Sequence, residues 1–151
     1  MAGVIAGGPS LPAGPALYRF SVEEYHRLVE AGGLFAGKRV ELLEGMVVAK
    51  VTHNPPHDST VQSIDELVAG LLPAGWCKRC QLAVTLTDSE PEPDLCVARG
   101  DRRTYRHRHP GPPDIGLVIE VADTSLAYDR VDKGRAYARA GIVEYWIGES
   151  R

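Results

Sequence analysis

One stretch of the sequence decides the fold, and it reads IGLVIEVA from Ile115 to Ala122. Both alternating sets of positions are apolar, which is typical of a central strand buried on both faces of a sheet. The exception is Glu120, because an ionised carboxylate is costly to bury unless it is paired or holds a metal. The stretch therefore predicts a central strand that carries a functional acid.

A second acid opens a neighbouring apolar segment. Asp94 follows Pro93 and precedes the short apolar run 95–98. If this strand lies beside Glu120, two negative charges meet and each disfavours ionisation of the other. A divalent cation removes that penalty, and Mg²⁺ is held by one or two carboxylates with waters and phosphate oxygens. The alternatives are a strand-start acid at Asp94 and a buried arginine partner for Glu120.

A lysine follows on the next predicted helix. Lys133 has Asp129 four residues before it and Tyr137 four residues after it, so the three share one helix face. If this face packs over the two acids, the ammonium can orient a water nucleophile or stabilise developing negative charge. The alternative is a surface ion pair with Asp129, worth about 0.3–0.5 kcal/mol. Spacing alone slightly favours the surface pair.

The remaining patterns predict an α/β fold with a mixed central sheet flanked by helices. Ser21 and Glu24 form a capping box, and Glu44-Gly45 is the turn of a hairpin. One helix is predicted to begin after Ser21 and to end at Gly32-Gly33, and two more cover 57–72 and 129–140. The predicted strands cover 40–43, 46–48, 82–87, 94–98, 115–122 and 143–147.

Length and composition limit the class of protein. The chain has 151 residues, 44% hydrophobic and 25% charged, and a net charge of −3. We expect a flexible lead-in over residues 1–16, which are rich in Gly, Ala and Pro, and one domain over 17–151. No apolar run is long enough for a membrane span. Three cysteines and no signal-like start favour a reducing, cytoplasmic setting.

Several short motifs in order resemble the Uma-two family of the PD-(D/E)XK nuclease superfamily, from about Tyr18 to Ile147. The motifs are RVELLEG at 39–45, NPPH at 54–57, Pro93-Asp94, VIEV at 118–121, Asp129 with Lys133 and Tyr137, and GIVEYW at 141–146. The resemblance implies a restriction-endonuclease-like core. It also implies a shortened C-terminal part, because members generally continue through further strands.

The resemblance assigns roles to individual residues. Asp94 and Glu120 become ligands of Mg²⁺ or Mn²⁺, with the Val121 carbonyl as a third, and Lys133 becomes the catalytic lysine. The superfamily's lysine commonly lies two residues beyond the second acid, where this chain has Ala122.

Two further residues match family positions upstream of these acids. Glu41 matches an upstream acid that completes the metal shell or binds through water. His57 matches a histidine that contacts a phosphate or a metal-bound water. The alternative for His57 is an ordinary polar residue at a helix start.

A basic loop offers nucleic-acid contacts. It carries Arg102, Arg103 and Arg106 around Tyr105 on an otherwise acidic chain. Arginines beside the carboxylates would bind phosphates, and the tyrosine would stack on a base. The alternative is a solvated, arginine-rich loop.

Two other patterns have metal-like spacing. Cys77 and Cys80 form a CxxC pair that His107 and His109 could complete as a zinc site, but a strand would point the two thiols to opposite faces. His53 and His57 are separated by two prolines, so no helix is expected to align them. We assign neither pattern a metal.

Together these inferences predict a metal-dependent endonuclease that hydrolyses phosphodiester bonds, with DNA as its partner. The competing hypothesis is a non-catalytic nucleic-acid or protein interaction module that retains the nuclease fold. A third is a zinc-stabilised, partner-binding domain that depends on Cys77 and Cys80. No membrane partner is expected, and a homodimer is left open.

Overall fold

The computed structural model describes residues 16–33, 35–50, 52–123 and 126–150. The predicted lead-in over residues 1–16 lies outside the described residues, apart from Ala16.

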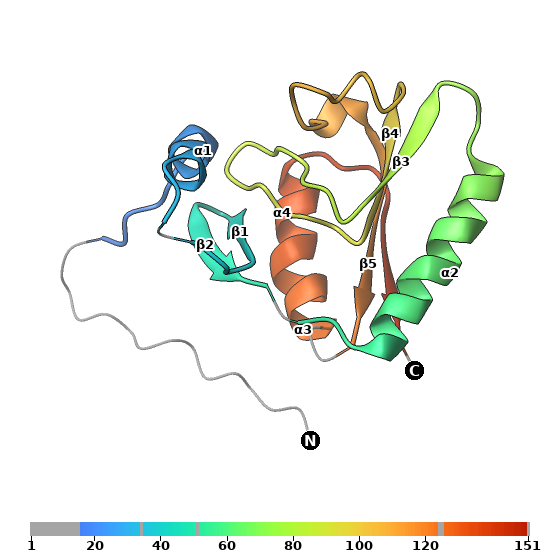
Figure 1. Ribbon diagram of the computed structural model, residues 1–151, viewed down its shortest axis with the longest axis horizontal. Coiled ribbons are helices and arrows are strands. Elements are labelled where there is room, and N and C mark those ends of the chain that lie inside the picture. Colours follow the sequence, from blue (N-terminus) through green and yellow to red (C-terminus); the bar gives the residue numbers. More distant parts are fainter. Residues whose placement is uncertain (1–15, 34, 51, 124–125, 151) are drawn as a thin grey trace.

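A four-stranded mixed sheet forms the centre of the molecule, which confirms the predicted fold class (Figure 1). Its order is β3-β4-β5-β6, with antiparallel pairs β3/β4 and β4/β5 and a parallel pair β5/β6. The strands are β3 (Trp76–Cys80), β4 (Leu95–Arg99), β5 (Ile115–Ala122) and β6 (Tyr145–Glu149). The strand predicted from IGLVIEVA is therefore interior, with a neighbour on each side.

Helices cover both faces of this sheet (Figure 1). On one side lies α2 (Pro55–Leu71), and on the other a helical segment made of α3 (Leu126–Tyr128), η2 (Asp129–Lys133) and α4 (Gly134–Arg139). Alternation along β5 explains its apolar sequence. Val118 packs towards α4, while Leu117 and Ile119 lie in an apolar pocket with residues of α2.

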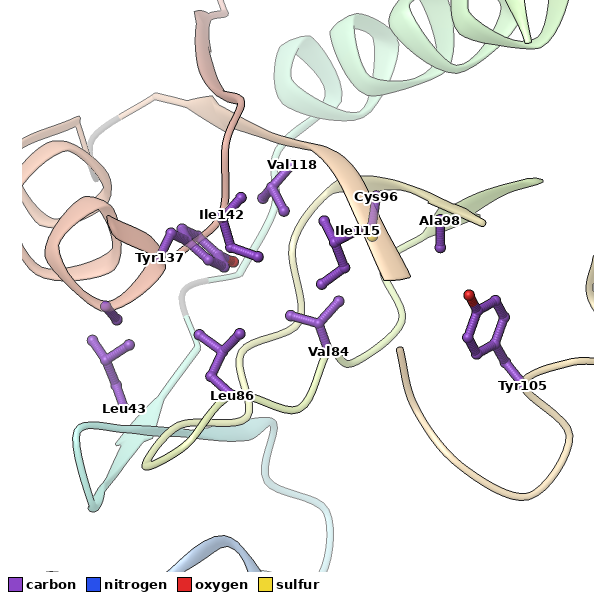
Figure 2. Close-up of a cluster of buried hydrophobic side chains, with 11 residues drawn as sticks. Leu43, Val84, Leu86, Cys96, Ala98, Tyr105, Ile115, Val118, Tyr137 and Ile142 are labelled. Atoms are coloured by element: carbon purple, nitrogen blue, oxygen red, sulfur yellow. The ribbon is translucent and has the colours of Figure 1, made fainter. Parts of the chain in front are cut away.

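The main core lies between the sheet and α4 (Figure 2). Val118 and Cys96 from the sheet meet Tyr137 from α4, all with at most 1% of their surface exposed. Val84 and Leu86 complete this core from the segment after β3. That segment was predicted as a strand over 82–87, and this prediction is wrong.

The error at 82–87 has a visible cause. Gln81 has a positive φ of 50° and ends β3. The chain then stays extended, and the Val84 and Leu86 amides donate to the Pro91 and Ser89 carbonyls instead of to a neighbouring strand. The alternating apolar residues reflect the burial of Val84 and Leu86. This alternation does not reveal whether a neighbouring strand is present to form backbone hydrogen bonds.

The N-terminal part contains the predicted helix and hairpin. The capping box of Ser21 and Glu24 starts α1 (Val22–Glu30), and β1 (Val40–Leu43) pairs with β2 (Met46–Ala49). At their turn Glu44 and Gly45 both have positive φ, 48° and 76°, as a two-residue hairpin loop requires. A bridge between Leu42 and Glu90 joins the hairpin to the rest of the molecule.

Several boundaries differ from the predictions, and three of them matter for the fold. α2 begins at Pro55, because the two prolines occupy its first turn and the Asn54 side chain caps it by accepting from the His57 amide. The helix predicted at 129–140 begins at Leu126 and contains a π-helical turn, η2. The last strand runs over 145–149, two residues later than predicted.

Within the part of the chain that the structure describes, none of the helices combines the length and apolarity that crossing a bilayer requires.

Candidate active site

A pocket lies where β4 begins and β5 ends, beside the start of α2 and the segment η2. Its space of about 80 Å³ is enough for more than one water-sized group. The structure brings together in its lining six residues predicted from the sequence: Glu41, His57, Asp94, Glu120, Val121 and Lys133.

Asp94 is held at the mouth of β4 by three contacts. Its Oδ2 accepts a hydrogen bond from the Val121 amide at 2.8 Å and lies 3.3 Å from His57 Nε2. Its Oδ1 accepts from Gln81 Nε2 at 3.4 Å. The bond to Val121 joins β4 to β5, so it fixes the carboxylate beside the Glu120 strand.

Glu120 points from β5 towards α4 and is 3% exposed. Its Oε1 accepts from Lys133 Nζ at 2.9 Å and from the Tyr137 hydroxyl at 3.0 Å. Burial raises the pKa of Glu120 to about 7, and the nearby Asp94 carboxylate adds to this rise against the opposing effect of Lys133. The Asp94 carboxylate at the start of the adjacent strand therefore disfavours the ionisation of Glu120.

Lys133 is buried among carboxylates, with 6% of its side chain exposed. Its Nζ lies 2.9 Å from Glu120, 3.4 Å from Glu41 and 3.9 Å from Asp129. Burial lowers the pKa of Lys133, but the charges of Glu120 and Glu41 outweigh it and hold the pKa above its ordinary value. The surface ion pair considered above is therefore wrong: the pair with Asp129 exists, but inside the pocket.

The backbone at Lys133 is unusual. Asp129 and Lys133 are the first and last residues of η2, a π-helical turn between two α-helical pieces. Such turns occur frequently at functional sites, because the widened turn redirects side chains. Both side chains are buried, as is Tyr137 one turn later, which confirms that the three share one face.

Glu41 enters the pocket from β1. Its Oε2 accepts from the Glu92 amide at 3.0 Å, and its Oε1 lies 3.4 Å from both the Tyr128 hydroxyl and Lys133 Nζ. The hairpin thus contributes an acid to a site built mainly by the sheet.

His57 and His53 stack at the mouth of the pocket, with ring centroids 4.2 Å apart. The sequence argument that the prolines keep them apart is wrong, because Pro55 and Pro56 are the first residues of α2 and leave His53 immediately before its cap. Burial is the main cause that lowers the pKa of His53.

The lining carries a marked excess of negative charge. Six acids face two lysines in the pocket described here, so full ionisation leaves four uncompensated negative charges: Glu41, Glu92, Asp94, Glu120, Asp123 and Asp129 against Lys50 and Lys133. A hard divalent cation prefers oxygen ligands, and the carboxylates of this negatively charged pocket supply them.

The basic loop does not lie beside these acids. β4 runs from Leu95, next to Asp94, to Arg99, and the loop follows that far end of the sheet (Figure 1). Arg102, Arg103 and Arg106 are exposed there, so the structure does not bring them together with the carboxylates, and their contact with phosphates stays a prediction.

Tyr105 also differs from its predicted role. Its side chain belongs to the core, and its hydroxyl donates to the Arg99 carbonyl (Figure 2). The guanidinium groups of Arg79 and Arg108 each lie about 5 Å from its ring centroid. The core and these two guanidinium groups already contact the Tyr105 ring, so it is not placed to stack on a base.

Cys77 and Cys80 both lie on β3 and are free thiols. They pair with Ala98 and Leu95 of β4, and their spacing of three places them on opposite faces of the strand. The CxxC pair therefore cannot converge on one ion.

Sequence reasoning missed several residues of the pocket. Tyr128 and Asp123 flank the segment between β5 and η2, and Glu92 lies between two prolines. Polar side chains close in sequence to Asp94 and Asp129 were a signal that these residues belong to the same site. However, only the fold brings them to one place.

The fold and this acid, acid and lysine cluster define a nuclease-like α/β domain. A family model, Uma2, described as "Putative restriction endonuclease", matches residues 22–151. The chain therefore belongs to the Uma2 family, the Uma-two family of the sequence analysis.

Comparison with solved structures supports the fold. The chain is similar to a protein described as a "putative nuclease belonging to DUF820 from Anabaena variabilis ATCC 29413", with a TM-score of 0.66 and 13% sequence identity. The match covers 86% of this chain and 74% of that chain. Comparison with curated proteins finds no match.

Proposed function

We propose that this protein is a metal-dependent endonuclease that hydrolyses phosphodiester bonds in DNA. The observation that carries the proposal is the convergence of Asp94, Glu120 and Lys133 in one buried, strongly acidic pocket. Membership of the Uma2 family supports the nuclease class.

In this proposal Asp94 and Glu120 hold Mg²⁺ or Mn²⁺, with the Val121 carbonyl as a further ligand. When bound, such an ion supplies a polarised phosphate and a water of lowered pKa. The Val121 amide and His57 orient Asp94, and Glu41 supports the cluster through its contact with Lys133. In the same proposal His57, which lines the pocket beside Asp94, contacts a substrate phosphate.

Lys133 acts as a charged donor in this proposal. Because its pKa is held above the ordinary value, the side chain stays an ammonium at neutral pH. It therefore orients the attacking water or stabilises the charge of the transition state, and does not remove a proton.

The proposed setting is the cytoplasm. The three cysteines are free thiols, two of them on opposite faces of β3 and the third, Cys96, in the core. This arrangement suits a reducing compartment.

The competing proposal is a binding module that retains the fold. Cleavage of single-stranded, double-stranded and branched DNA with Mg²⁺ or Mn²⁺ tests the two. The nuclease predicts metal-dependent internal cuts that disappear with Glu120→Gln. DNA binding without cleavage on every substrate would support the module, and RNA in parallel would reveal a different substrate.

A further inference from the structure

Three metal-binding side chains meet at the mouth of the pocket, where His53 and His57 stack beside Asp58. His53 Nδ1 lies 3.5 Å from Asp58 Oδ1, and His57 Nδ1 lies 3.4 Å from the same oxygen. We infer that His53, His57 and Asp58 form a separate binding site for a divalent transition ion that prefers imidazole, such as Zn²⁺. This inference does not depend on the proposed nuclease activity.

The distances suit tetrahedral coordination. Zn²⁺ binds imidazole nitrogen at about 2.0–2.1 Å and carboxylate oxygen at about 2.0–2.2 Å. At the tetrahedral angle such bonds place neighbouring ligand atoms roughly 3.3–3.5 Å apart. Both separations to Asp58 have this value, and the ligand atoms of all three residues lie within 4.8 Å of one another. Because the two rings stack face to face, one of them must turn out of the stack before both lone pairs reach one ion.

The second nitrogen of His57 supports this assignment independently. Histidines that bind metals usually donate their other ring N–H to a carboxylate, which fixes the tautomer. His57 Nε2 lies 3.3 Å from Asp94 Oδ2, so a proton on Nε2 leaves the Nδ1 lone pair directed at the new site.

The neighbouring groups explain how an ion would enter. Gln81 Nε2 lies 3.1 Å from His53 Nδ1, and because an amide nitrogen can only donate, His53 Nδ1 accepts with its lone pair. The ion replaces this amide. The Asp58 side chain is 62% exposed, which leaves the fourth coordination position open to water.

The ligand types distinguish this site from the carboxylates of the same pocket. Carboxylates and waters suit Mg²⁺, whereas two imidazoles favour Zn²⁺, Ni²⁺ or Co²⁺. Asp94 touches both sites, because it contacts His57 and also lies in the carboxylate pocket. The two ions are therefore expected to influence each other's affinity.

The test is calorimetric titration with Zn²⁺ in excess Mg²⁺, with Co²⁺ absorption as a second readout of tetrahedral nitrogen coordination. His53→Gln and the exposed Asp58→Asn should each weaken Zn²⁺ binding by roughly 100-fold or more, since even supporting residues contribute 10–100-fold. His107→Gln, an exposed histidine of the basic loop, is the matched control and should bind as wild type.

Glu120→Gln separates the two sites, because it removes a ligand of the carboxylate pocket only. Retained Zn²⁺ binding in this variant supports the inference. Weak Zn²⁺ binding by wild type, equal binding by all variants, or loss in Glu120→Gln would overturn it. Metal-dependent DNA cleavage measured in zinc-free buffer tests the nuclease proposal separately, so either idea can fail alone.

Discussion

At the scale of single residues, the buried lysine is the sharpest test of chemistry. Lys133→Met keeps the apolar stem but removes the ammonium that lies 2.9 Å from Glu120. We predict that DNA cleavage falls by roughly 10²-fold or more, the typical cost of losing one preorganised electrostatic group. Mg²⁺ binding should persist. Turnover under saturating Mg²⁺ and calorimetry measure the two effects.

The matched control is Arg130→Met, which makes the same kind of change at an exposed position of the same segment. It should leave turnover within about twofold of wild type, because surface charges contribute little. Equal losses in the two variants would remove Lys133 from the proposed site.

A second residue-scale prediction concerns pH. Because the pKa of Glu120 is about 7 in the folded protein and near 4.5 when unfolded, the folded state binds this proton more tightly. The contribution of Glu120 to the free energy of unfolding is fully present below pH 4.5 and is lost as pH rises through 7. The stability of Glu120→Gln relative to wild type should therefore increase between pH 5 and pH 8, in the absence of metal.

Urea denaturation at several pH values measures this difference, and subtracting the variant removes the contributions of other titrating groups. Saturating Mg²⁺ should abolish the loss in wild type at pH 8. A constant difference across the range would show that Glu120 has an ordinary pKa.

At the scale of elements, the start of α2 positions His57. The Asn54 side chain accepts from the His57 amide and also donates to Asp123, which follows β5. Asn54→Ala should lower the free energy of unfolding by about 1 kcal/mol, the usual cost of a lost cap. Asn54→Ser retains a capping oxygen and should recover most of this loss.

Denaturant midpoints compare the two variants. If Asn54→Ala and Asn54→Ser were equally destabilised, the contact with Asp123 and not the cap would be the main contribution.

The elements also show what sequence patterns can predict. Continuous apolar character identified β5, and local signals such as the capping box of Ser21 and the Glu44-Gly45 turn identified α1 and the hairpin. These predictions rest on short-range chemistry. The strand predicted over 82–87 was wrong, because side-chain alternation reports burial and a strand also needs a backbone partner.

The sequence predicted those site residues whose charged side chains lie in apolar segments. Glu120 and Asp94 stood out because acids in apolar strands need a reason, and the family resemblance assigned Lys133 to the same site. The stacking of His53 on His57 and the distance of the basic loop from the acids depend on how distant elements meet. No local pattern contains that information.

At the scale of the whole molecule, the acidic pocket is lined by residues of the hairpin, the sheet and both helical layers. A cation in it therefore stabilises the folded state over the unfolded one. At 100 times its dissociation constant, such an ion contributes about 2.7 kcal/mol. For a chain of this size, that free energy should raise the melting temperature by roughly 5–10 °C.

The double variant Asp94→Asn with Glu120→Gln tests this coupling between site and fold. Both changes keep the shape of the side chain, and the amide oxygen introduced at position 94 can still accept from the Val121 amide. The metal-free variant should melt at or above the wild-type temperature, because the repulsion between the two acids is gone. Its melting temperature should not respond to Mg²⁺ or Mn²⁺, while that of wild type rises. A metal-induced rise of equal size in both proteins, measured by calorimetry at pH 8, would place the cation elsewhere in the molecule.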